Sequence, residues 1–377
     1  GTDLEFYRRR RVLYHHALYD LERIGAKRTA IQNLYPSKRR VSAMVLKKGL
    51  FFRFFLCPPL HMVITQRRRS MSFPWIADAH TDFLSRVWHN ASILQPNSSD
   101  QGQFSLAGLQ QGKIGLQIFA LFIDSSRPEH PVSQCLRQLC AYDRMLNAWG
   151  PYFILPAELD TLACPFGSTR AVLSIEGGEA CDDSTELLQL YARLGVRAMS
   201  LVWNHANTLA YPALDGQHTQ NGLTTQGMRF VRCMNEYRVA IDVSHLNPAG
   251  FWDCISYSQA PLFASHSNAY ALCPHPRNLT DTQIRALIEQ DGYIGLNFNA
   301  AFLSTSQSSV QDIVRHALHI LDLGGENSLG FGSDFDGVMA LPYGLHGTQD
   351  FSLILQAFQN AGIRGSLLDK IAHQNLV

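Results

Sequence analysis

From residue 75 onward, short apolar runs rich in β-branched residues alternate with longer segments of helical periodicity. Eight of these runs have the length and composition of strands buried on both faces. They are residues 75–80, 113–123, 171–178, 197–204, 239–245, 262–268, 293–298 and 328–337. Amphipathic helical patterns lie between them, at residues 132–149, 184–195, 224–237 and 279–292. Apolar strands joined by helices predict an α/β protein with a parallel sheet, and eight such units favour a (β/α)₈ TIM barrel over an open doubly wound sheet.

The charges are divided unevenly along the chain, although the net charge is only +1. Residues 1–70 contain 16 Lys and Arg against 4 Asp and Glu, whereas the remaining residues contain 16 against 27. An acidic body suits a cation-binding site better than a nucleic-acid surface. We expect residues 1–70 to be a basic extension, non-native or poorly ordered, and residues 71–377 to form the barrel. The alternative is that the extension binds nucleic acid or anionic lipid.

One run, residues 50–64, has the apolar character of a membrane segment. It is too short to span a bilayer, and Arg53 and Pro58-Pro59 interrupt it, so we expect no membrane span. The eight cysteines are scattered and include no Cys-x-x-Cys pair, so no disulfide can be inferred from them. A cytoplasmic location is therefore the simpler expectation.

Histidines and carboxylates follow most of the predicted strands. Those strand ends carry His80 and Asp82, Glu176, His205, His245, His266, and Asp334 with Asp336. In a (β/α)₈ barrel the C-terminal ends of the strands meet at one face, where reactive groups gather. Imidazole and carboxylate donors without cysteine are typical of a catalytic zinc site. The set exceeds what one tetrahedral ion needs, so it indicates two metal ions bridged by a carboxylate, which would activate a bridging water.

Each of these elements is weak evidence alone. The sequence EGGE at residues 176–179 could be only a turn that needs glycine, and Arg277 could be a solvated surface residue. Their shared placement at one end of the sheet carries the prediction. No Gly-x-Ser-x-Gly elbow, Walker loop or Gly-x-Gly-x-x-Gly motif is present, so serine-hydrolase and nucleotide-binding functions are unsupported. The two lysines of the barrel region, Lys113 and Lys370, lie away from the strand ends, which disfavours Schiff-base chemistry.

Seven motifs, in this order, resemble the membrane dipeptidase (renal dipeptidase) family, including its bacterial members. They are DAHTD (78–82), IEGGE (175–179), WNHANT (203–208), DVSH (242–245), SHSNAY (265–270), PRN (276–278) and GFGSDFDG (330–337). The resemblance covers about residues 74–377 and implies a barrel with two zinc ions that hydrolyses dipeptides.

The resemblance also implies a role for each matched residue. His80 and Asp82 would bind one zinc ion, His245 and His266 the other, and Glu176 would bridge the two. His205 would stabilise the oxyanion, and Arg277 would hold the free carboxylate of the substrate. Asp334 would be the acid/base that manages the proton of the attacking water.

Family members are commonly homodimers, and some accept a D-residue at the C-terminal position or hydrolyse dehydropeptide-like β-lactams. This chain departs from the family pattern in three places. Residues 1–70 have no counterpart, Phe302 stands where tyrosine is frequent, and the family usually continues past Val377, so we expect a truncated C-terminus.

Three functions compete for this sequence. The first is a zinc dipeptidase, and the second is a related binuclear-metal amidohydrolase acting on another small amide or lactone. The third is a non-catalytic or nucleic-acid-binding protein that uses the basic N-terminal segment. Arg277 favours the first, because a substrate without a carboxylate has no use for it. We therefore expect a dipeptide substrate, a homodimer and no nucleic-acid partner.

Overall fold

The computed structural model describes residues 74–95, 98, 102–154 and 168–377. The basic segment at residues 1–70, and with it the prediction of an extension, lies outside the described residues.

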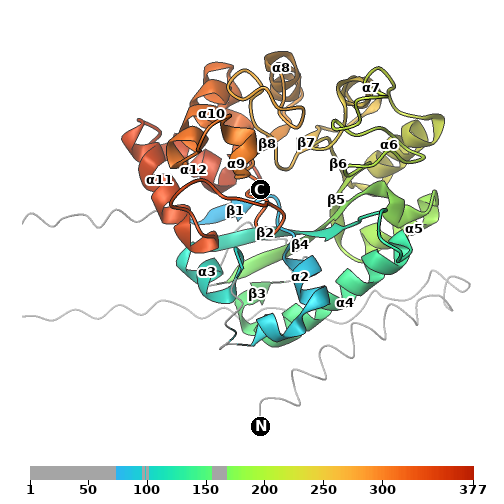
Figure 1. Cartoon of the computed structure of the whole chain (residues 1–377), viewed down its shortest axis with the longest axis horizontal. Coiled ribbons are helices and arrows are strands. Elements are labelled where there is room, and N and C mark those ends of the chain that lie inside the picture. The colour runs from blue at the N-terminus through green and yellow to red at the C-terminus, as the bar shows by residue number, and fades with distance from the viewer. Residues whose placement is uncertain (1–73, 96–97, 99–101, 155–167) are drawn as a thin grey trace, which may run out of the picture. The chain divides into compact units, whose positions relative to one another are not determined.

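Eight parallel strands close into a barrel in the described part of the chain (Figure 1). They are β1 (Ile76–Asp78), β2 (Ile114–Phe122), β4 (Thr169–Glu176), β5 (Val196–Ser200), β6 (Ala240–Asp242), β7 (Phe263–Ala264), β8 (Tyr293–Leu296) and β9 (Leu329–Phe331). The ring closes where β1 pairs with β9. Each of the eight predicted strands overlaps one of these, and the predicted (β/α)₈ barrel is confirmed.

A ninth strand, β3 (Phe153–Ile154), was not predicted from the sequence. It pairs with Thr169 and Arg170, the first two residues of β4. The strand β2 occupies the opposite edge of β4 from Arg170 to Glu176. On the same edge as β3, β5 pairs with β4 only from Leu173 onward. The strand β3 therefore extends the sheet beside the start of β4 without entering the ring.

Helices surround the strands (Figure 1). They are α2 (Phe83–His89), α3 (Leu106–Gln111), α4 (Pro131–Trp149), α5 (Thr185–Arg193), α6 (Thr225–Tyr237), α7 (Pro248–Tyr257), α8 (Asp281–Glu289), α9 (Ala300–Leu303), α10 (Val310–Asp322), α11 (Phe351–Asn360) and α12 (Gly365–Asp369). The four predicted helices correspond to α4, α5, α6 and α8. Thr280 caps α8 through a reciprocal capping box with Gln283, which stabilises the start of the helix. None of the helices in the described ranges is both long and apolar enough to cross a bilayer.

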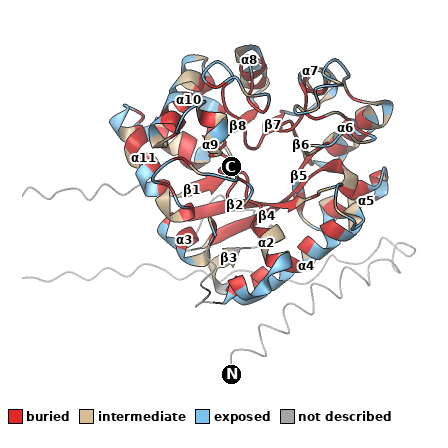
Figure 2. Ribbon diagram, in the orientation of Figure 1, coloured by how far each residue is buried: buried red, intermediate tan, exposed pale blue. Residues whose placement is uncertain are grey.

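The buried side chains form two layers, and the strands are buried almost throughout (Figure 2). A small inner cluster takes its members from six different strands of the ring: Ala77, Ala79, Leu116, Ile118, Val172, Ala198, Phe263 and Tyr293. Side chains from so many strands can meet only inside the barrel, so this cluster fills its interior. A larger apolar cluster lies between the strands and the helices.

The chain end closes the barrel at the N-terminal side of its strands. Leu376 packs against the inner cluster, and the ring of His373 stacks on Trp75, just before β1, with centroids 4.1 Å apart. The open side of the barrel is therefore the side where the strands end.

Candidate metal centre

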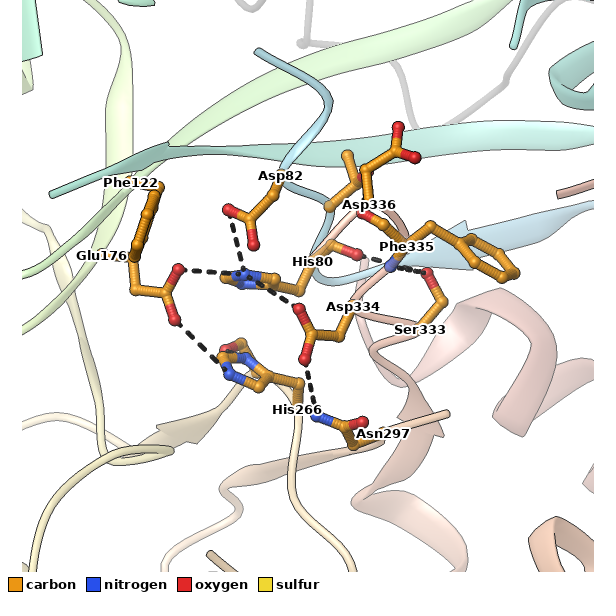
Figure 3. A network of polar contacts seen from close by, with 12 residues as sticks. His80, Asp82, Phe122, Glu176, His266, Asn297, Ser333, Asp334, Phe335 and Asp336 are labelled. Atoms are coloured by element: carbon orange, nitrogen blue, oxygen red, sulfur yellow. Dashed lines mark hydrogen bonds and ion pairs between the residues drawn. The ribbon is translucent and has the colours of Figure 1, made fainter. Parts of the chain in front are cut away.

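Most of the polar residues predicted from the strand ends come together at the C-terminal end of the barrel (Figure 3). Glu176 is the last residue of β4, His80 follows β1 by two residues, and His266 follows β7 by two. His245 and Asp334 each lie three residues beyond their strands, β6 and β9. All five side chains are buried.

His80 is surrounded by three carboxylates. Its Nε2 lies 3.5 Å from Glu176 Oε2 and 3.9 Å from both Asp82 Oδ1 and Asp334 Oδ1. Within the described residues, both ring nitrogens of His80, Asp82 Oδ1 and Glu176 Oε2 have no hydrogen-bond partner. Buried polar atoms are normally paired, so the three unpaired atoms that face one another, His80 Nε2, Asp82 Oδ1 and Glu176 Oε2, suit a cation between them.

The other oxygen of Glu176 faces a second pair of histidines. Glu176 Oε1 lies 2.7 Å from His245 Nε2 and 3.7 Å from His266 Nε2, and the two nitrogens are 3.0 Å apart. Ligands about 2.0–2.2 Å from a tetrahedral zinc ion lie roughly 3.3 Å from one another. The donor atoms on both sides of Glu176 have this kind of spacing, so the residues present fit a binuclear metal site.

The electrostatics of the cluster agree with this fit. Burial alone would lower the pKa of His80, but Glu176, Asp82 and Asp334 raise it to about 10. The three carboxylates thus stabilise a positive charge beside the His80 ring. Burial, with the Arg277 charge, lowers the pKa of His245 to about 4. Burial and the neighbouring cations also hold the pKa of His266 well below its usual value, so both rings are neutral, as metal ligands must be.

Asp334 lies in a tight turn after β9. Its backbone is left-handed, with φ 61°, and its Oδ2 accepts a hydrogen bond of 3.0 Å from Asn297 Nδ2. A Cβ at Gly337 would lie 2.1 Å from Asp82 Oδ2 and 2.3 Å from Asp334 Oδ1, so only glycine allows this approach. Burial and Glu176 raise the pKa of Asp334 to about 6.

Asp336, two residues further on, does not join the cluster. Its carboxylate accepts hydrogen bonds from Arg86 Nη1 at 2.9 Å and from the backbone N–H of Gln103 at 2.8 Å. Asp336 therefore anchors the turn that carries Asp334.

Arg277 is buried in the wall of a cavity of about 410 Å³ that opens onto the cluster. Its Nη2 donates to His245 Nε2 at 3.1 Å, and its Nη1 has no partner within the described residues. Burial lowers the pKa of Arg277 to about 10, so the group remains charged near neutrality. A buried guanidinium with a free donor fits an anionic group in the cavity.

The structure does not bring His205 into the cluster. Its side chain is 48% exposed, and Nε2 lies 4.0 Å from Asp124 Oδ1. The preceding residue, Asn204, lines the cavity instead, and its Oδ1 lies 3.1 Å from His245 Nδ1. Sequence reasoning missed Asn204, because an amide after a strand does not stand out as a histidine does.

The cysteines that the structure describes play no part in this centre. Six of the eight lie in the described ranges, and all six are free thiols, Cys273 among them.

Comparisons with known proteins agree with the geometry. A dipeptidase of Aspergillus oryzae, aclJ, is 28% identical over 84% of this chain and 81% of its own. A protein encoded in the pqqA 5′ region of Klebsiella pneumoniae is 33% identical over 66% of this chain and 96% of its own.

A solved metallopeptidase from Rhodobacter sphaeroides, bound to a phosphinate mimic of the dipeptide L-Ala-D-Ala, superposes with a TM-score of 0.74. It is 27% identical, and the match covers 81% of this chain and 98% of that one. The membrane dipeptidase family, peptidase family M19, matches residues 65–377, and the chain belongs to this family.

Proposed function

We propose that this chain is a zinc dipeptidase with two metal ions per chain. The observation that carries the proposal is the shared cavity: Asp82 and Glu176, whose unpaired oxygens face His80, line one wall, and a buried guanidinium with a free donor lies on another. A dipeptide has the two groups that such a cavity can hold, a scissile carbonyl and a free carboxylate. The cavity volume of about 410 Å³ lies within the range of small-molecule sites.

The metal ligands are assigned from the two sides of Glu176. His80 and Asp82 would hold one ion, His245 and His266 the other, and Glu176 would bridge them. Two such ions, when bound, would polarise the scissile carbonyl and lower the pKa of the attacking water.

Arg277 binds the substrate's free carboxylate in this proposal. A guanidinium and a carboxylate can form two parallel charge-assisted hydrogen bonds, which fixes the distance between the chain terminus and the scissile bond. The walls beside it include Phe122, Trp203 and Phe302, so the cavity offers apolar surface to the substrate side chains. Since the Rhodobacter sphaeroides relative is bound to a mimic of L-Ala-D-Ala, we include a D-residue at the C-terminal position among the candidate substrates.

Asp334 is the acid/base of the proposed reaction. An acid/base works best with a pKa near the working pH, and burial raises the pKa of Asp334 to about 6. Its carboxylate can take a proton from the attacking water and return it to the leaving amine. Asn297 holds it in place through the hydrogen bond to Oδ2.

We assign support of the developing oxyanion to Asn204 rather than to His205. The Oδ1 of Asn204 accepts from His245, which leaves its Nδ2 as a donor at the cavity wall. Donors placed where negative charge develops accelerate acyl transfer.

Metal analysis of the purified chain, combined with hydrolysis assays, tests the function. We expect two zinc ions per chain and cleavage of a panel of L,L and L,D dipeptides. Absence of both metal and dipeptide hydrolysis would sink the proposal, and cleavage of other small amides in its place would favour the amidohydrolase. The homodimer, the cytoplasmic location and the extension at residues 1–70 stay predictions, and sedimentation of the chain with and without residues 1–70 tests the first and the last.

A further inference from the structure

A continuous line of short hydrogen bonds runs from the end of β6 to the ring of His266. Asp242 Oδ2 lies 2.5 Å from Ser265 Oγ, and Ser265 Oγ lies 2.6 Å from His266 Nδ1. All three side chains are buried. The far nitrogen of the same ring, Nε2, faces Glu176 and His245.

The direction of each hydrogen bond follows from counting protons. A carboxylate only accepts, and Asp242 Oδ1 already accepts from the Ser244 and Ser265 backbone N–H groups and from the Ser244 hydroxyl. The single hydroxyl proton of Ser265 therefore goes to Asp242 Oδ2. Ser265 Oγ has no second proton to give, so His266 Nδ1 must be the donor.

This count leaves Nε2 of His266 without a proton and with its lone pair facing the cluster. We infer that Ser265, oriented by Asp242, is a positioning residue that fixes the tautomer of His266 and so makes its Nε2 the metal-binding atom. The inference rests on the proposed binuclear centre and deepens it.

The three histidines of the cluster are held differently. His245 Nδ1 faces Asn204 Oδ1, whereas His80 Nδ1 has no hydrogen-bond partner within the described residues. The Asp242–Ser265 pair therefore acts on His266 alone. Loss of such an outer partner typically weakens metal binding about 10- to 100-fold.

Asp242→Asn offers a sharp test, because it keeps the shape of the side chain and reverses the direction of the hydrogen bonds that join residue 242, Ser265 and His266. Two backbone N–H groups point at the Oδ1 position, so the carbonyl oxygen of the new amide must stay there. Its NH₂ group then faces Ser265 Oγ and donates to it. The Ser265 proton turns to His266 Nδ1, and the ring proton moves to Nε2, where a metal cannot bind.

The measurement is zinc affinity by chelator competition, with the melting temperature of the metal-free protein as the check on folding. We expect one of the two zinc ions to bind about 10- to 100-fold more weakly in Ser265→Ala, and at least as weakly in Asp242→Asn. In the double variant Asp242→Asn/Ser265→Ala, zinc should bind no more weakly than in Ser265→Ala alone, since the hydroxyl that relays the effect of residue 242 is gone.

Ser267→Ala is the matched control. Ser267 is buried on the same turn, and its hydroxyl has no hydrogen-bond partner within the described residues, so its removal should leave both zinc affinities unchanged. An equal loss in this control would mean that the turn is merely fragile, and the inference would be wrong.

The wild-type protein provides an independent readout. The ¹⁵N shifts of the metal-free protein, with the His266 signals identified by their loss in His266→Gln, should show a proton on Nδ1. A proton on Nε2, or two zinc ions bound at wild-type strength in both Ser265→Ala and Asp242→Asn, would overturn the inference. Failure of the wild type itself to bind two ions would instead overturn the proposed function.

Discussion

Arg277 Nη2 lies 3.1 Å from His245 Nε2, the same nitrogen that lies 2.7 Å from Glu176 Oε1. An imidazole nitrogen has one lone pair, so His245 cannot accept from Arg277 and bind a metal ion at the same time. With metal bound, the guanidinium keeps both terminal nitrogens for another acceptor in the cavity. The position of Arg277 beside His245 thus sets a short, fixed distance between the proposed carboxylate-binding group and the proposed metal centre.

This distance predicts a strong preference for a free C-terminal carboxylate. Leaving a buried guanidinium unpaired costs on the order of a few kcal/mol, or about two powers of ten in rate. We expect the enzyme to cleave a dipeptide at least about 100-fold faster, in kcat/KM, than the same dipeptide amidated at its C-terminus. Arg277→Ala should remove this preference by slowing the free acid, and assays of both substrates measure the effect.

Arg127 provides the control for Arg277. It lines the same cavity, but its Nε donates to Asp124 at 3.2 Å and it lies near the rim. Arg127→Ala should leave the ratio of acid to amide cleavage within about threefold. If the wild type cleaves acid and amide equally well, Arg277 does not bind the carboxylate.

Glu176→Gln should lower metal content and activity together. The two oxygens of Glu176 face different histidines, and an amide can offer only one acceptor oxygen. We expect fewer than two zinc ions per chain after dialysis, measured by metal analysis, with a loss of activity beyond the 10- to 100-fold typical of an outer residue.

Glu179, on the turn after Glu176, gives the matched control for this variant. Glu179→Gln should keep both ions. Two tightly bound zinc ions in Glu176→Gln would contradict the bridging assignment.

The fold could be predicted because the strands are apolar along their whole length. The predicted and observed strands differ mainly at their ends. The run at residues 262–268 predicts a long strand, but β7 contains only Phe263 and Ala264. Beyond Ala264 the Ser265 side chain contacts Asp242 and His266. The strand β3 could not be predicted, since two residues carry no periodicity.

The site could be predicted only as far as position determines it. A residue that ends a barrel strand, such as Glu176, has little choice of where to lie, so its place follows from the topology. A residue in a longer loop, such as His205, can turn either way, and the sequence alone does not fix its direction. Ser265 was missed because the role of its hydroxyl depends on which neighbouring groups donate and accept hydrogen bonds, which the sequence does not show.

Asn204 and His205 should differ sharply in their effect on catalysis. Asn204 lines the cavity and contacts His245, whereas the side chain of His205 is half exposed. We expect Asn204→Ala to lower kcat/KM about 100-fold, the usual scale for loss of an oxyanion donor, and His205→Ala to lower it less than about threefold. Steady-state assays of both variants decide the matter. A large loss in His205→Ala alone would restore the oxyanion role to His205 and show that its loop closes over the substrate.

The stability of the fold should depend on pH through Glu179. Burial raises the pKa of this carboxyl to about 7 from an ordinary value of 4.5, and its Oε2 has no hydrogen-bond partner within the described residues. The folded state therefore holds the proton more tightly than the unfolded state does. The resulting contribution to the free energy of unfolding is complete below pH 4.5. It is lost as the pH rises through 7, because the folded protein must then bury a charge.

Glu179→Gln removes the titrating group and keeps its shape. The stability of the variant relative to the wild type should therefore rise by on the order of 2 kcal/mol between pH 5 and pH 8. Urea unfolding between pH 5 and 8.5 measures the difference, and groups common to both proteins cancel in it. A difference for Glu179→Gln that does not change with pH would show that the carboxyl is ionised at no cost in the folded protein, through a donor that compensates its burial.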